Sequence, residues 1–163
     1  MNAGSSGSKS LLPLVEILIS IGIFAIAVIL TLQLFLLAKF LGDKTSDTAK
    51  AIFETQTVAE TIKTMKTDAD MEDYIQNGLN GGIVYYDEEW NIVGSKDEAA
   101  YNLIISLETD DTYSSGNLYK FKLDMYKIEP YPFIDDKKVE RDENYIPVLV
   151  SIDASKFIIN KAE

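Results

Sequence analysis

The chemistry open to this chain comes from carboxylates, lysines and hydroxyl groups. The sequence has no His and no Cys, which excludes an imidazole base, a thiolate nucleophile, a disulfide and a zinc site of the usual type. The net charge of −11 disfavours nucleic acid as a partner, because phosphates would be repelled. No Gly-rich phosphate loop or nucleotide fingerprint occurs, so we expect no cofactor and no enzymatic activity. A carboxylate-pair hydrolase is the distant alternative.

An acidic cluster, DADMED at residues 68–73, is the nearest approach to a metal motif. Asp68, Asp70 and Glu72 alternate as the first ligands of an EF-hand loop do. That template requires Gly where Asp73 stands and a bidentate Glu where Leu79 stands. The cluster therefore indicates an exposed acidic turn, and we predict no metal site.

Glu16 stands at the edge of a long apolar segment. Residues 17–38 carry no charge, and as a helix these 22 residues would span about 33 Å, enough to cross a bilayer core of roughly 30 Å. A secretory signal peptide is the alternative, but its apolar stretch would measure only about 7–15 residues. Placing a carboxylate in the membrane costs something like 2.5–3.5 kcal/mol at mid-bilayer and less near the end of the helix. We therefore expect Glu16 to pair with another group or to serve a function.

The sequence LPLVE at residues 12–16, followed by this apolar helix, resembles the N-terminal segment of type IV pilins and type II secretion pseudopilins. In that family a polar leader ends in Gly, and Glu is the fifth residue of the mature chain. The resemblance makes residues 1–11 the leader, places its cleavage between Leu11 and Leu12, and makes Glu16 the family's glutamate. Leu11 stands where the family has Gly.

The resemblance implies a structural subunit of a type IV pilus or a type II secretion-like pseudopilus, most consistent with a minor pilin. The α-amino cation exposed at Leu12, which the family N-methylates, would pair with Glu16 of an adjacent subunit and set the register of the filament. The implied partners are other pilin-like subunits, the membrane, a prepilin peptidase and an assembly platform. The C-terminal domain would be extracytoplasmic, and assembly would carry it to the cell surface or pilus.

A single-pass, membrane-tethered extracytoplasmic binding or sensor module is the alternative from another class. It would never polymerise, Glu16 would have no subunit partner, and residues 68–163 would contain a ligand pocket.

The segments that position these residues divide the chain into a leader (1–11), a transmembrane helix (12–41), an amphipathic helix (42–66) and a β-sheet head (67–163). Beyond residue 48 the helical period continues, through Ala49, Ile52, Phe53, Gln56, Ala59, Ile62 and Met65. Gly42 and residues 43–48 weaken the join, which leaves both a bend or loose turn and an unbroken helix open there. Unbroken, the helix would extend about 80 Å.

After residue 82 the hydrophobic period becomes two. We predict a hairpin from 83–87 and 90–93, strands at 100–108, 118–128 and 146–153, and a long charged loop at 130–144. Such strands have one apolar face that needs a cover, which Ile52, Phe53, Ala59 and Ile62 of the helix should supply. The predicted fold class is α+β, a long N-terminal helix packed on a small antiparallel sheet.

Overall fold

The computed structural model describes residues 11–110, 112–113, 115–142 and 144–159. Its first element, helix α1 (Leu11–Thr64), is 54 residues long. Pro13 lies in the first turn, where its missing N–H costs nothing. The backbone remains helical through Gly42 and residues 43–48, so of the two alternatives the structure has the unbroken helix.

Contacts divide the chain into two units, Met1–Leu41 and Gly42–Glu163. In the first unit the described apolar side chains from residue 14 to residue 35 are exposed. Among the described residues one helix, Pro13–Thr64, is long and apolar enough to cross a membrane, with a mean hydropathy of 2.7 in its most apolar window. This weakly indicates a single-pass membrane protein.

The second unit contains a five-stranded antiparallel sheet in the order β2-β1-β3-β4-β5. Its strands are β1 (Ile83–Tyr86), β2 (Ile92–Val93), β3 (Tyr101–Asp110), β4 (Gly116–Lys127) and β5 (Val148–Ile159). The predicted hairpin and the three long strands are therefore present. At the start of β4 only glycine fits, because a Cβ on Gly116 would collide with the carbonyl of Ile158.

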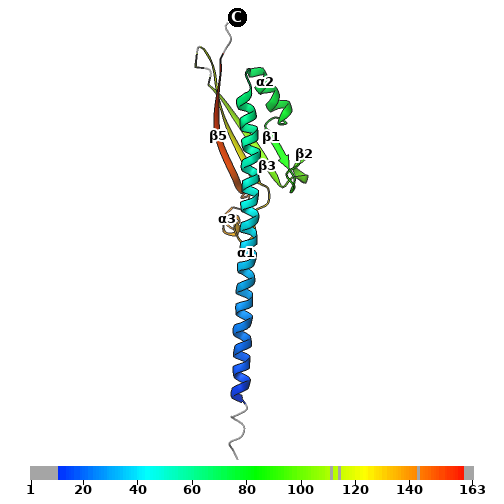
Figure 1. Ribbon diagram of the computed structural model, residues 1–163, viewed down its shortest axis with the longest axis vertical. Helices are drawn as coiled ribbons and strands as arrows, with labels where there is room; N and C mark the ends of the chain where they lie inside the picture. The colour runs from blue at the N-terminus through cyan, green and yellow to red at the C-terminus, as the bar shows by residue number, and fades with distance from the viewer. Residues whose placement is uncertain (1–10, 111, 114, 143, 160–163) are drawn as a thin grey trace, which may run out of the picture. The chain divides into compact units, whose positions relative to one another are not determined.

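The second half of α1 packs on one face of this sheet and confirms the α+β prediction (Figure 1). The contact face of the helix consists of Ala51, Thr55, Val58, Ala59 and Ile62. On the sheet it meets large buried side chains that include Leu103, Phe121, Leu123 and Met125. Small helical residues opposite large strand residues allow the two layers to interlock.

Two residues predicted to pack on the sheet are exposed. Phe53 is 65% exposed and Ile52 is 39% exposed. At 3.6 residues per turn Phe53 lies on the side of the helix opposite Ala51 and Ile62. The prediction is confirmed for Ala59 and Ile62, which are buried against the sheet. For Phe53 it was wrong because it gave weight to a large apolar side chain, whereas the buried face contains two alanines and a threonine.

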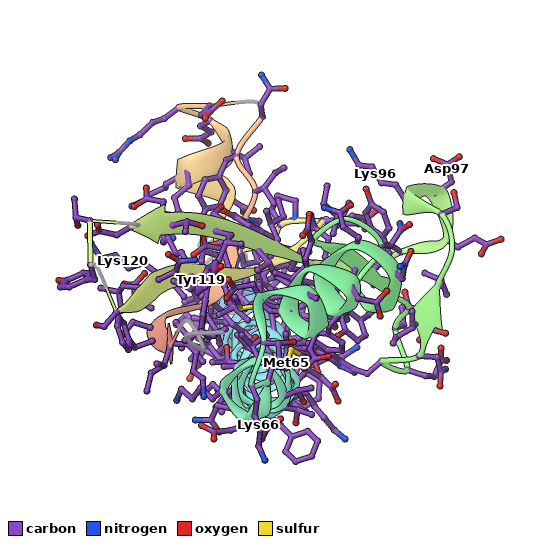
Figure 2. The ribbon with its side chains drawn as sticks, turned by 90° about the horizontal axis from the view of Figure 1, so that it is seen from above. Met65, Lys66, Lys96, Asp97, Tyr119 and Lys120 are labelled. Atoms are coloured by element: carbon purple, nitrogen blue, oxygen red, sulfur yellow. The ribbon has the colours of Figure 1, made fainter. Side chains whose placement is uncertain are left out.

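Short elements connect these parts. Helix α2 (Asp68–Asp73) is capped by the Thr67 hydroxyl, which accepts from the Asp70 N–H, and continues into a π-helical turn, η1 (Tyr74–Gly78). A 3-10 turn, η2 (Lys96–Glu98), precedes β3, and helix α3 (Asp136–Val139) lies within the predicted loop 130–144. Seen from above, Lys96 and Asp97 of η2 lie across the head from Lys120 of β4 (Figure 2).

Candidate functional site

The residues that the sequence singled out lie at the beginning of α1. Leu11 is the first residue of the helix and Leu12 the second, while residues 1–10 of the predicted leader lie outside the described residues. Glu16 is exposed and helical, and its carbonyl accepts a 2.8 Å hydrogen bond from the Ser20 hydroxyl. The carboxylate of Glu16 is therefore open to a partner outside its own chain.

A second group of residues, which the sequence did not single out, joins α1 to the segment that precedes β5. Oδ2 of Asp47 on α1 accepts a 2.6 Å hydrogen bond from the Tyr131 hydroxyl and a 3.1 Å ion-paired hydrogen bond from Lys127 Nζ of β4. The same Lys127 also donates to the Tyr101 hydroxyl of β3 at 3.2 Å. We call these four residues the Asp47 cluster.

Aromatic rings enclose the cation of the Asp47 cluster. Lys127 Nζ lies 4.5 Å from the ring centroid of Tyr101 and 4.9 Å from that of Tyr131. Trp90 stacks on the Tyr101 ring with the centroids 4.1 Å apart. Cation–π contacts add to the ion pair where water is excluded, and Asp47 and Lys127 are only 16% and 20% exposed. The Asp47 cluster is thus a partly desolvated contact between helix and sheet.

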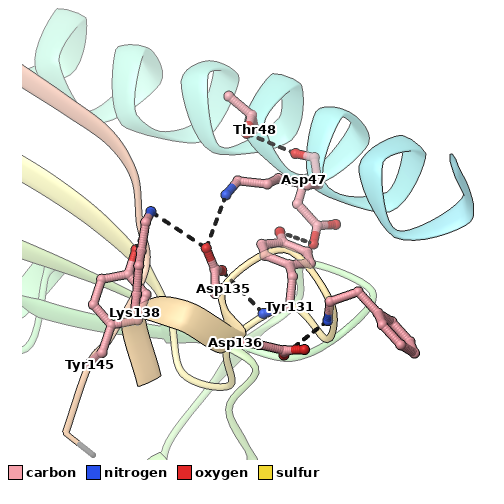
Figure 3. A network of polar contacts seen from close by, with 9 residues as sticks. Asp47, Thr48, Tyr131, Asp135, Asp136, Lys138 and Tyr145 are labelled. Carbon is pink, nitrogen blue, oxygen red and sulfur yellow. Dashed lines mark hydrogen bonds and ion pairs between the residues drawn. The ribbon is translucent and has the colours of Figure 1, made fainter. Parts of the chain in front are cut away.

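Asp135 forms a second contact beside the first (Figure 3). It is fully buried, and its Oδ2 accepts a 3.2 Å hydrogen bond from the Tyr131 N–H. Its Oδ1 lies 3.5 Å from Nζ of both Lys44, on α1, and Lys138, on α3. Two cations near one buried carboxylate offset the cost of removing that charge from water.

Both tyrosines of the Asp47 cluster stay protonated well beyond neutral pH. Burial, followed by the hydrogen bond to the Asp47 carboxylate, raises the pKa of Tyr131 far above its ordinary value. The same causes raise the pKa of Tyr101. A neutral phenol can donate to a carboxylate, so each of these groups suits a structural hydrogen bond.

The acidic turn at residues 68–73 is helical, and Asp68 accepts a 3.2 Å hydrogen bond from the Asn117 side chain. No three Asp or Glu side chains in the described part of the chain are grouped to hold a metal ion.

An open hollow of about 550 Å³ lies on the sheet face turned away from α1. Its lysines, Lys120 and Lys122, lie opposite Ser106, Glu108, Asp153 and Ser155 in the strand register. Lys122 also forms a 3.2 Å ion pair with Asp124. The hollow is therefore lined by cations whose charges are matched by neighbouring carboxylates.

Comparisons with protein-family models, with curated proteins and with solved structures find no match to this chain. The class that the fold itself defines is an α+β protein whose N-terminal helix is apolar enough to span a membrane.

Proposed function

We propose that this chain is a structural subunit of a type IV pilus or type II secretion-like pseudopilus, and specifically a minor pilin that assembles through its N-terminal helix. One observation carries the proposal. A single helix, α1, has exposed apolar side chains in its first half and packs its second half on an antiparallel sheet. That division suits a subunit that is stored in a membrane and bears a polar head.

The first half of α1 requires an apolar environment on every side. Its exposed residues include Ile17, Leu18, Ile21, Phe24 and Leu34. Lipid satisfies them before assembly, and the equivalent helices of neighbouring subunits satisfy them afterwards, so extraction from the membrane exchanges one apolar environment for another. Head-to-tail contacts repeated between identical or similar chains generate an open filament.

Glu16 sets the axial register of neighbouring helices in the filament. Among packed helices an unpaired carboxylate would be strongly unfavourable, whereas a carboxylate paired with the α-amino group of a neighbouring subunit is tolerated. Cleavage between Leu11 and Leu12 would create that amino group. The side chain of Glu16 is exposed in the single chain, so it is available for this pair.

The head supports assembly and performs no catalysis in this proposal, and it requires no cofactor. The Asp47 cluster and Asp135 hold the second half of α1 against the sheet, so force on the helix is transmitted to the head. Placement of residues 42–163 outside the cytoplasm, and on the pilus after assembly, follows from the same proposal.

The test is incorporation of the full chain beside other pilin-like subunits, measured by crosslinking and co-purification at matched membrane levels. Glu16→Gln preserves size and hydrogen bonding but removes the charge, and we expect incorporation to fall by about tenfold or more. Glu60→Gln is the matched control, because Glu60 is an exposed glutamate on the same helix, paired 3.0 Å from Lys63.

Equal incorporation of wild type and Glu16→Gln would remove the pairing role. If even the wild-type chain is not incorporated, the membrane-tethered binding or sensor module becomes the better account.

A further inference from the structure

Strand β5 is a long sheet edge that lacks a second neighbour in the described part of the chain. It is 12 residues long and pairs with β4 only. The opposite edge is β2, which has two residues. From residue 150 to residue 159 the register of β5 is regular, since its one irregularity lies near Met125 and Tyr126. An edge of this length presents a row of unpaired N–H and C=O groups.

Between residues 150 and 159 the usual protections of an edge strand are absent from β5. Proteins shield such edges with Pro, bulges or outward lysines. The strand has two charged residues, and both interact within the head. Lys156 Nζ donates a 2.6 Å hydrogen bond to the Lys63 carbonyl at the end of α1, and Asp153 lies opposite Lys122 of β4. The remaining residues are apolar or small, and Phe157 and Ile159 are 40% and 70% exposed.

The direction of β5 limits how a second copy of the chain could pair with it. Near the start of β5 the Pro147 carbonyl accepts a hydrogen bond from the N–H of Lys127, and the side chain of Lys127 forms an ion pair with Asp47 of α1. Near the end of β5, Lys156 donates a hydrogen bond to the carbonyl of Lys63, at the end of α1. The second half of α1 therefore runs in the same direction as β5. An antiparallel pair of β5 strands from two copies would therefore make the second halves of their two helices run in opposite directions.

Two further observations point to a different chain. In the described part of the chain the other edge of the sheet is β2, which is too short to pair along β5. Each copy also carries a net charge of −11, so copies repel one another and a basic segment is attracted.

We propose that β5 accepts an extended strand from a different, net-basic protein, which adds to the sheet through backbone hydrogen bonds along residues 150–159. Main-chain pairing supplies the affinity, and alternate side chains supply the specificity. Beside Phe157 and Ile159 the incoming strand should carry apolar side chains, because cross-strand apolar pairs stabilise a sheet. The proposal does not depend on filament assembly.

The probe is a synthetic peptide with the sequence of residues 118–127, LYKFKLDMYK. It alternates apolar and polar residues, has a net charge of +2, and reproduces the strand that β5 already recognises on its other side. Hydrogen–deuterium exchange of the full chain in detergent micelles is measured with and without the peptide. We expect exchange of the β5 amides to slow by about tenfold while exchange in β1 and β2 is unchanged. The control is the same peptide N-methylated at alternate residues, which keeps every side chain but cannot pair.

Two exposed isoleucines at opposite edges supply matched variants. Ile159→Lys places a cation beside the basic peptide and should weaken its binding by about tenfold. Ile92→Lys, at a residue 73% exposed in β2, should have no effect. Unchanged β5 exchange, equal protection by the N-methylated peptide, equal loss in both variants, or spontaneous pairing of β5 between two copies would each overturn the proposal.

Discussion

The hydroxyl of Tyr131 donates a 2.6 Å hydrogen bond to Asp47, a residue 84 positions earlier in the chain. Asp47 belongs to the first turns of α1 in the second unit, and Tyr131 belongs to the segment between β4 and β5. This contact, with the nearby ion pairs of Asp135, fixes the helix to the sheet at one end of the head. At the other end, Lys156 bonds the carbonyl of Lys63.

Tyr131→Phe should lower the free energy of unfolding of the head by about 1.5 kcal/mol, since hydrogen bonds to a charged group contribute about 1.5–3 kcal/mol. The measurement is urea unfolding of the full chain in detergent, followed by the fluorescence of Trp90, which stacks on Tyr101. Tyr145→Phe is the control: the Tyr145 hydroxyl bonds the exposed Lys138 at 2.9 Å, and its loss should cost less than about 0.5 kcal/mol. Equal losses would contradict the role of the Asp47 cluster.

The two phenylalanines Phe121 and Phe53 should respond differently to truncation. Phe121 is 2% exposed in the centre of β4, and Phe121→Ala should cost about 3–5 kcal/mol. Phe53 faces away from the sheet, so Phe53→Ala should change stability by less than about 0.5 kcal/mol. Denaturant midpoints of the two variants compare them directly, and a large cost at Phe53 would mean that its exposed face is covered in the folded protein.

Thr55 offers a stabilising substitution. It is fully buried between α1 and the sheet, and its hydroxyl has no hydrogen-bond partner among the described residues. Thr55→Val keeps the shape and removes the unpaired group, so stability should rise by about 1 kcal/mol. Thr57→Val is the matched control, because the exposed Thr57 hydroxyl bonds the Phe53 carbonyl at 2.9 Å. A lower melting temperature for Thr55→Val than for Thr57→Val would show that the Thr55 hydroxyl is satisfied.

Stability should fall at alkaline pH through Tyr86. Burial, with smaller contributions from Glu54 and Tyr74, raises the pKa of Tyr86 from 10.0 to about 12. Above pH 10 the unfolded chain releases this proton while the folded chain retains it, so the contribution of Tyr86 is complete below pH 10 and is lost as pH rises toward 12. Unfolding measured across this range should show a shallower decline in Tyr86→Phe. Tyr85→Phe, on the other face of β1, is the control, and identical slopes in the two variants would contradict the assignment.

Leader cleavage should respond to the residue before the cut. Co-expression with a prepilin peptidase should shorten the chain by residues 1–11, and Leu11→Gly should increase the yield, because the family has Gly at that position. Intact mass and N-terminal sequencing detect the product. Full-length protein in both cases, with a peptidase shown active on another substrate, would remove processing from the proposal.

The amino-acid sequence by itself determined the long helix, the strands and their order, but not helix α3, which lies in the predicted loop 130–144. The charge-free run at residues 17–38 required an apolar helix, and the change of period after residue 82 from 3.6 to 2 marked the sheet, because hydrophobic periodicity follows local backbone geometry. The strand ends were less well defined. The last predicted strand ends at residue 153, whereas β5 runs to Ile159.

Only the tertiary structure decided which helix face is buried and which distant residues meet. Ala51 and Thr55 pack on the sheet in place of Phe53, because close approach of a helix to large strand side chains favours small residues. Asp47 and Tyr131 are each ordinary polar residues in their own segments, and no spacing links them. Their hydrogen bond exists because chain connectivity and sheet pairing bring two segments together, a nonlocal outcome that local periodicity does not encode.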